Sequence, residues 1–150
     1  MKFLYTLLAL ALILGSCAKK KAEKQAKTDD DIIKQYVSDQ GLTATKTSSG
    51  LYVVIDNIGT GIGCNSNATV KASYKGYFTS GEVFDSSSAA GIDFDLQSVI
   101  KGWTEGIPYF KEGGNGKLLI PSALGYGTSG NSSIPANTVL IFDVKLIDVF

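Results

Sequence analysis

Residues 70–87 read VKASYKGYFTSGEVFDSS, and this stretch decides the fold of the chain. Residues 70–78 are rich in β-branched and aromatic side chains, which is the composition of a β-strand. Thr79-Ser80-Gly81 follows directly and is a turn signal. The stretch therefore predicts a strand that runs into a tight turn.

Four further segments carry strand patterns on either side of this one. They are residues 51–55, 94–96, 117–120 and 139–150. The last segment, VLIFDVKLIDVF, has apolar side chains on both parities, so neither face of the strand is purely polar. Such a strand is typical of the middle of a sheet that is covered on much of both sides.

Two helices are predicted beside these strands. A helix is expected from Asp30 to Gln40, because a cap residue and three acids occupy 28–31 and Gly41 offers a left-handed stop. Its apolar face would consist of Ile32, Ile33, Tyr36 and Val37. A second helical piece is expected from about Val99 to Phe110, and it must be short because two glycines and a proline interrupt it.

This arrangement predicts an α+β fold. We expect a twisted antiparallel sheet of five or six strands wrapped around one short helix, preceded by a short N-terminal helix. The predicted divisions of the chain are 1–16, 17–28, 29–48 and 49–150. The third is a short helix with its linker, and the fourth is the globular domain.

Composition excludes several classes of function. The chain has 14 Lys, 14 acidic residues, and neither Arg nor His. Without His there is no Ser-His-Asp triad and no imidazole ligand, and two Cys cannot form a thiolate zinc cage. Residues 28–150 hold eight Lys against 13 acids, which argues against a nucleic-acid partner. No metal or cofactor is expected.

The N-terminus has the pattern of a targeting segment. Met1-Lys2 is followed by an apolar run over 3–14, which is too short to span a bilayer and fits a signal peptide over 1–16. The sequence LGSC at 14–17 resembles the lipobox of bacterial lipoproteins, in which the Cys is acylated. We therefore expect lipidation at Cys17, the alternative being a plain signal peptide with an incidental Cys.

The lipid would anchor the chain in the cell envelope. Residues 18–27 hold five Lys against one Glu and no large aliphatic side chain, so 17–28 is expected to be a solvated tether. These Lys could also be attracted to anionic headgroups. Ala18 after the Cys favours the outer membrane, because the familiar signal for retention in the inner membrane is an Asp at this position.

Few residues could act as nucleophiles, acids or bases. Asp93 and Asp95 share a face of a predicted strand, and paired carboxylates can hydrolyse glycosides. The alternation of apolar residues opposite them favours two solvent-facing acids on an edge strand. A Ser-Lys pair is conceivable, but nothing marks any Lys for that role.

Five aromatic residues lie in five different segments. They could form a core, or they could line an apolar pocket whose opening is exposed to solvent, where the polar atoms of Tyr and Trp find hydrogen-bond partners. Composition leaves both interpretations open. The residues are Tyr74, Phe84, Trp103, Tyr126 and Phe142.

The context of these residues resembles a known family. Residues 70–87, VIKGWTEG at 99–106, IPSALGYG at 120–127 and IPANTVLIFDV at 134–144 are similar to four motifs of FKBP-type peptidyl-prolyl cis-trans isomerases. They occur in the family's order and cover about residues 50–150. The resemblance implies a pocket between the sheet and its short helix.

The resemblance also implies a role for each matched position. Trp103 would form the floor of the pocket under a proline ring, and Asp85 would lie near the reacting amide. Tyr126 and the backbone N–H of Ile100 would donate hydrogen bonds to substrate carbonyls. Apolar walls and sides would come from Tyr74, Phe84, Ile92, Phe94, Val99, Ile100, Ile134 and Phe142.

The activity implied is isomerisation of prolyl bonds in exported proteins during their folding. The partners would be proline-containing polypeptides and, through the lipid on Cys17, the membrane; macrolide inhibitors are implied as ligands, and the chain is expected to be a monomer. The polar flap at 128–133 departs from the family pattern. It keeps open a second reading, a lipid-anchored module that binds proline peptides with little or no turnover. A third reading, host contact through an unrelated face, has no apolar stretch outside the core to support it.

Overall fold

A computed structural model describes the backbone of residues 2–150 and the side chains of residues 18–150. It contains two α-helices, two single-turn 3-10 helices and seven strands within the described residues. In chain order they are α1 (Lys2–Asp39), β1 (Thr45–Lys46), β2 (Tyr52–Asn57), β3 (Thr69–Tyr77), β4 (Val83–Ser86), β5 (Ile92–Asp95), α2 (Lys101–Gly106), η1 (Ile107–Tyr109), β6 (Asn115–Ile120), η2 (Ser122–Leu124) and β7 (Leu140–Val149).

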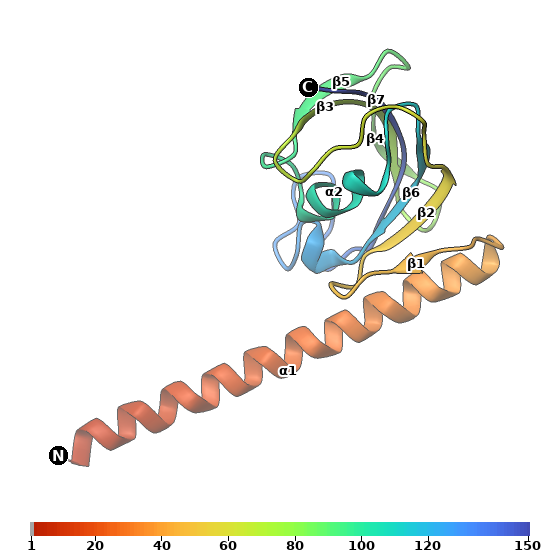
Figure 1. The fold of residues 1–150 in the computed structure, drawn as a ribbon. Helices are drawn as coiled ribbons and strands as arrows, with labels where there is room; N and C mark the ends of the chain where they lie inside the picture. Colours follow the sequence, from red (N-terminus) through yellow and green to blue (C-terminus); the bar gives the residue numbers. More distant parts are fainter. Residues whose placement is uncertain (1) are drawn as a thin grey trace.

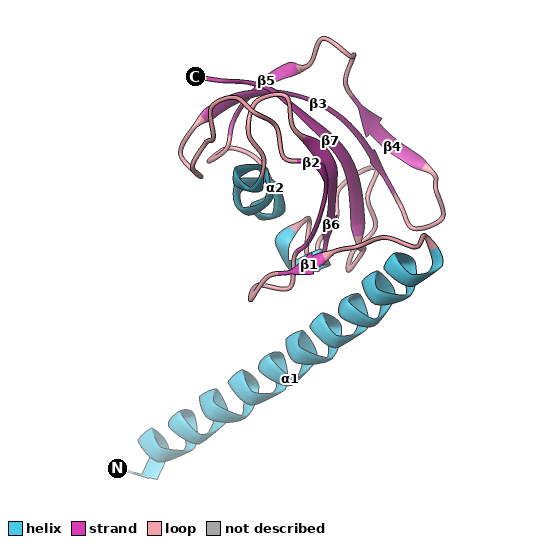
Figure 2. Ribbon diagram, turned by 45° about the vertical axis from the view of Figure 1, so that its right-hand side comes forward, coloured by secondary structure: helices cyan, strands magenta, loops and turns pink. Residues whose placement is uncertain are grey.

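The strands form one antiparallel sheet that curls around α2, which confirms the predicted fold class (Figures 1 and 2). The strand order is β1-β2-β6-β7-β3-β4, and β5 pairs with the other end of β3. The sheet has seven strands rather than five or six. The count is higher because the two-residue strand β1 is included, and because two short strands, β4 and β5, pair with different parts of the same edge of β3.

The central strand β7 separates two hydrophobic layers, as its pattern predicts. Phe142, Val144 and Leu146 are buried on the concave side, in the main core with α2. Ile141 has the opposite parity and is fully buried in a second cluster on the convex side. The apolar residues of the two parities of β7 therefore pack against different helices, α2 on the concave face and α1 on the convex face.

Two glycines allow α2 to lie very close to the sheet. A Cβ on Gly102 would come within 2.5 Å of the side chain of Ile120, and a Cβ on Gly106 would come within 2.6 Å of Leu118. Both distances are shorter than real Cβ contacts, so a side chain at either position would force the fully buried Ile120 or Leu118 side chain, or the helix itself, to shift. The close packing holds Trp103, which lies between the two glycines in sequence, at 4% exposure against the concave face.

The N-terminal helix begins earlier than predicted. A start at Asp30 is wrong, because α1 is one helix over Lys2–Asp39. Thr28 does not cap a helix start; its hydroxyl donates back to the carbonyl of Lys24 within the same helix. The predicted stop is confirmed, since Gly41 has φ +61° just beyond the last helical residue. No helix among the described residues is both long enough and apolar enough to cross a membrane.

Only the C-terminal part of α1 packs on the domain, and the rest projects away from it (Figure 1). Ile33 is fully buried in the convex cluster, and Tyr36 and Val37 pack against it. Ile32, which was predicted on the same face, is 39% exposed and lies outside that cluster. At helical spacing it falls too far round the cylinder from Ile33 to reach the sheet.

Two of the three acids near residue 30, Asp29 and Asp30, bind other elements, while Asp31 pairs with Lys27 within α1. Asp30 accepts a hydrogen bond from the Tyr52 hydroxyl at 2.7 Å and forms ion pairs with Lys34 and Lys46 at 2.7 and 2.6 Å. The hydrogen bonds from Lys34, Lys46 and Tyr52 hold the pKa of Asp30 well below its usual range. This cluster fixes the end of α1 to β1 and β2.

The close approach of α2 predicts a specific cost of adding one methyl group. Gly106→Ala should lower the free energy of unfolding by about 1–3 kcal/mol, because the new Cβ overlaps Leu118. Urea unfolding followed by circular dichroism measures this change. Gly63→Ala is the matched control, since its Cβ would meet only the Lys111 side chain at an ordinary 3.8 Å. Equal stability of the two variants would contradict the packing argument.

Candidate active site

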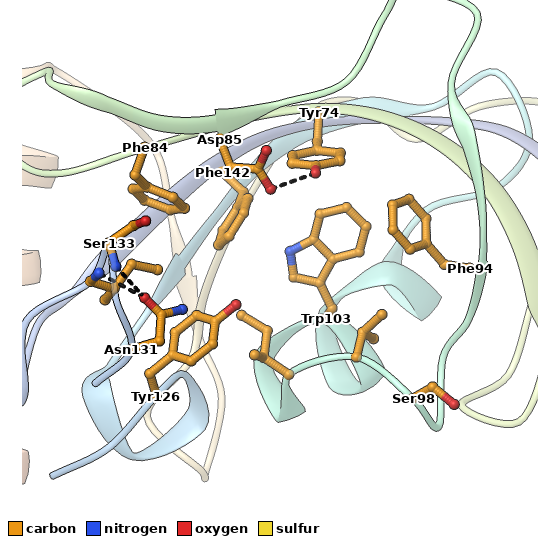
Figure 3. A pocket seen from close by; sticks show the side chains of 13 residues that line it. Tyr74, Phe84, Asp85, Phe94, Ser98, Trp103, Tyr126, Asn131, Ser133 and Phe142 are labelled. Carbon is orange, nitrogen blue, oxygen red and sulfur yellow. Dashed lines mark hydrogen bonds between the residues drawn. The ribbon is translucent and has the colours of Figure 1, made fainter. Parts of the chain in front are cut away.

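A cavity of about 690 Å³ opens between the concave face of the sheet and α2. Its walls come from β3, β4, β5 and β7, from α2 and the residues just before it, and from the loop between η2 and β7 (Figure 3). The lining residues are Tyr74, Phe84, Asp85, Phe94, Ser98, Val99, Ile100, Trp103, Tyr126, Asn131, Ser133, Ile134 and Phe142.

Trp103 lies at the centre of a ring of aromatic side chains. Its ring centroid is 5.1 Å from Phe94, 5.2 Å from Tyr74 and 5.5 Å from Phe142. All three contacts are edge-to-face, the geometry that aligns the positive edge of one ring with the negative face of another. Phe84 continues the wall by meeting Phe142 edge-on at 5.5 Å. Trp103 is itself one of the residues that line the cavity.

The polar edge of the cavity is a tyrosine–carboxylate pair. The Tyr74 hydroxyl donates to Asp85 Oδ2 at 2.7 Å, and the backbone N–H of Ser86 donates to the other carboxylate oxygen at 2.8 Å. Burial, and then the hydrogen bond to Asp85, raise the pKa of Tyr74 to about 12. Tyr74 therefore stays protonated and keeps Asp85 facing the aromatic wall.

Tyr126 begins the loop that closes the opposite side. Figure 3 shows its hydroxyl end directed into the space in front of Trp103. Farther along the loop, Asn131 Oδ1 accepts from the backbone N–H groups of Ser133 and Ile134, both at 2.8 Å. Gly130 N–H donates to the carbonyl of Tyr126 at 3.1 Å. These local bonds give the polar flap a defined shape.

The structure brings ten of the eleven predicted pocket residues together around this cavity. Ile92 is the exception: it lies on β5 at 47% exposure and does not line the cavity. The structure therefore does not bring Ile92 to the cavity wall: Phe94 lines the cavity, and Ile92, two residues earlier on the same face of β5, lies at the more exposed end of the strand.

Three lining residues were not among the predicted site residues. Asn131 and Ser133 belong to the flap, whose polar sequence is visible in the chain. Ser98 gives no such signal, and only its place directly before Val99 could have indicated it. These hydroxyl and amide groups make the cavity mouth more polar than its floor.

The lining residues limit the chemistry that is possible. None of them is a Lys or a Cys, so the cavity offers no covalent nucleophile of these kinds and no Ser-Lys pair. Asp93 and Asp95 also lie outside it; Asp93 is exposed beside Lys71, and Asp95 binds the turn at Gln97. The site can hold an apolar group over an indole, with hydrogen-bonding groups at the rim.

Comparison with known proteins decides which family this geometry represents. The profile of the family described as FKBP-type peptidyl-prolyl cis-trans isomerase matches residues 63–147. The chain belongs to this family. This match covers β3 to most of β7 and includes every residue that lines the cavity.

Curated relatives of this FKBP-type chain come from several bacteria. A probable FKBP-type peptidyl-prolyl cis-trans isomerase of Haemophilus influenzae is 42% identical over 96% of this chain and 62% of its own length. FkpA of Escherichia coli K12 is 38% identical over 96% of this chain and 55% of its own length. The chain thus spans between half and two thirds of the length of these two relatives.

Solved structures agree with this assignment. The crystal structure of FkpA from Escherichia coli superposes with a TM-score of 0.73 at 37% identity, covering 96% of this chain and 70% of that one. A peptidyl-prolyl cis-trans isomerase from Pseudomonas syringae pv. tomato superposes with a TM-score of 0.74 at 30% identity, covering 85% and 94%. Because it covers 96% of this chain, the alignment with FkpA includes most of α1 as well as the domain.

The Tyr74–Asp85 pair predicts a measurable ionisation. In Asp85→Asn, the pKa of Tyr74 should fall from about 12 but stay above the usual value of about 10. Burial is the larger of the two causes and persists in the variant. Ring ¹³C chemical shifts of labelled tyrosine, followed against pH, measure this change. A pKa that does not move would mean that Asp85 has no electrostatic influence on Tyr74.

Proposed function

We propose that this chain is a peptidyl-prolyl cis-trans isomerase that acts on proline-containing polypeptides during the folding of exported proteins. The single observation that carries the proposal is the indole of Trp103, which is ringed by aromatic edges at the floor of a cavity. A pyrrolidine ring is apolar and nearly flat, and it fits the open side of such a floor.

The reaction needs no group that the cavity lacks. Rotation about an X–Pro bond breaks amide resonance against a barrier of roughly 18–20 kcal/mol, but no covalent bond is made or broken. The planar amide is more dipolar than the twisted one, so water stabilises the ground state more than the transition state. A largely apolar cavity removes this preference and lowers the barrier. Absence of His and Arg from the chain is no obstacle to such a mechanism.

Two hydrogen-bond donors lie where substrate carbonyls would sit. Neither the hydroxyl of Tyr126 nor the backbone N–H of Ile100 makes a hydrogen bond to another described residue. Both belong to lining residues of the cavity. In the proposed complex they bind the carbonyls that flank the twisting bond, while Asp85 lies beside the amide at the polar edge.

A direct assay tests the activity. NMR exchange spectroscopy on short X-Pro-Phe peptides, with the full chain in detergent, should show accelerated cis–trans exchange. Trp103→Ala/Asp85→Ala should lower kcat/KM by about tenfold or more, equivalent to roughly 1.4 kcal/mol or more of transition-state stabilisation. Tyr109→Ala/Asp93→Ala is the matched control, since it removes one aromatic ring and one acid that lie outside the cavity.

The same spectra separate the isomerase from a binding module. A binding module is the second candidate because Asn131 and Ser133 make the cavity mouth polar. Peptide signals that shift on binding while exchange stays at the uncatalysed rate would favour that module. Signals that neither shift nor exchange faster would contradict both proposals.

We further propose that the chain is a monomer, and that a lipid on Cys17 anchors it in the outer membrane of the cell envelope. The side chain of Cys17 lies outside the described part of the structure. The sequence LGSC at 14–17 supports this. Lys19, Lys20, Lys21 and Lys24 are all exposed on the helical segment that follows, where they could meet anionic headgroups. Macrolide inhibitors are proposed ligands of the same cavity.

Acylation of the chain gives a simple test of the anchor. Cells that express Cys17→Ser should lose labelled palmitate from this protein, and the chain should leave the membrane fraction. Cys64→Ser is the matched control because it removes the other thiol, which lies beside the main core. Retention of label in Cys17→Ser would overturn the proposed anchor.

A further inference from the structure

The N-terminal helix buries one carboxylate against the domain. Asp29 on α1 is fully buried, and within residues 18–150 no Lys forms an ion pair with it. Its Oδ2 accepts hydrogen bonds from the backbone N–H of Ser122 at 2.9 Å and from the Ser122 hydroxyl at 2.6 Å. Gln25 donates to Oδ1 at 2.7 Å. A buried carboxylate is tolerated only when donors are placed around it in this way, so the position of Ser122 is tightly specified.

Ser122 in turn fixes the backbone on both sides of Tyr126. Its carbonyl oxygen accepts from the N–H of Gly125 at 3.0 Å and from the N–H of Gly127 at 2.8 Å. Tyr126 lies between these two amides. A continuous series of hydrogen bonds therefore joins the Asp29 carboxylate to the backbone that carries a lining residue of the cavity.

We propose that Asp29 is a positioning residue for Tyr126, so that the N-terminal helix forms part of the isomerase site. This inference rests on the proposed function. Tyr126 is 39% exposed, and its hydroxyl has no hydrogen bond to a described residue that would hold it. Its place in front of Trp103 is therefore set through its backbone, and that backbone is held by Ser122 and Asp29.

Docking of α1 does not depend on Asp29 alone. Ile33 is buried in the convex cluster, and Asp30 binds Tyr52 and Lys46. None of these contacts involves Asp29. The bonds to Ser122 are a separate connection, directed at the loop that carries Tyr126.

The test is a double-mutant cycle on kcat/KM for an X-Pro-Phe peptide, with the full chain in detergent. Asp29→Ala should lower kcat/KM by about threefold to tenfold, the effect of losing one or two hydrogen bonds. In a Tyr126→Phe background the same change should lower it by less than about twofold, because Asp29 acts through Tyr126. Asp31→Ala is the matched control: it removes the same charge two residues along α1, from an exposed site paired with Lys27. Asp29→Asn, which keeps an acceptor oxygen, should recover part of the loss.

A second measurement follows the backbone directly. The ¹⁵N–¹H signals of Gly125 and Gly127 should shift in Asp29→Ala and in Ser122→Ala, and should stay unchanged in Asp31→Ala. Equal activity of Asp29→Ala and Asp31→Ala, or an equal loss from Asp29→Ala with and without the Tyr126 hydroxyl, would overturn the inference while leaving the proposed function intact. An inactive unaltered chain would instead overturn the proposed function, and the inference with it.

Discussion

The close approach of α2 to the concave face of the sheet is the constraint on which the rest of the site depends. Gly102 and Gly106 let the backbone of the helix lie against Ile120 and Leu118, where any side chain would overlap them. The short helix can then place Trp103 against the concave face of the sheet, in edge-to-face contact with three other aromatic rings. A helix held farther away would leave the sheet free to flatten or the indole free to turn. The cavity is thus a product of backbone packing, and the aromatic walls follow from it.

The sheet also has a second covering, on its convex face. There Ile33 and its neighbours on α1 bury an apolar layer of their own, and the acids at 29 and 30 bind across it. Asp143, farther along the same face, is partly buried; burial opposes its ionisation, but hydrogen bonds from Lys117 and Tyr77 keep the pKa of Asp143 below its usual value. The N-terminal helix is therefore joined to the domain by apolar packing and by buried polar contacts together. This makes it an integral part of the fold, although most of its length lies beyond the sheet.

The features that sequence predicted well are those whose side chains have a strict period or a matched motif. The two parities of β7 placed it at the centre, and the motif around Trp103 located the floor of the cavity. The errors have a different origin. Thr28 and its neighbouring acids look like a helix start, but Asp29 binds a serine nearly a hundred residues away and Asp30 binds a tyrosine on β2, and no local pattern contains such partners. Ile92 was expected to line the cavity with Phe94, and the structure does not place it there. Alternation along a strand shows which side chains share a face, but not how much of that face borders the cavity.

Trp103 is the chain's single tryptophan. Ultraviolet light at the long-wavelength end of the protein's absorption band therefore excites one side chain only, and that side chain lines the cavity. The emission spectrum of the unlabelled protein consequently describes one place in the molecule. A ligand that displaces water from the indole changes the wavelength and the quantum yield of its fluorescence. Separation of α2 from the sheet changes both quantities as well. Occupancy and integrity of the site can thus be observed optically in the native chain, without a reporter group that would alter either.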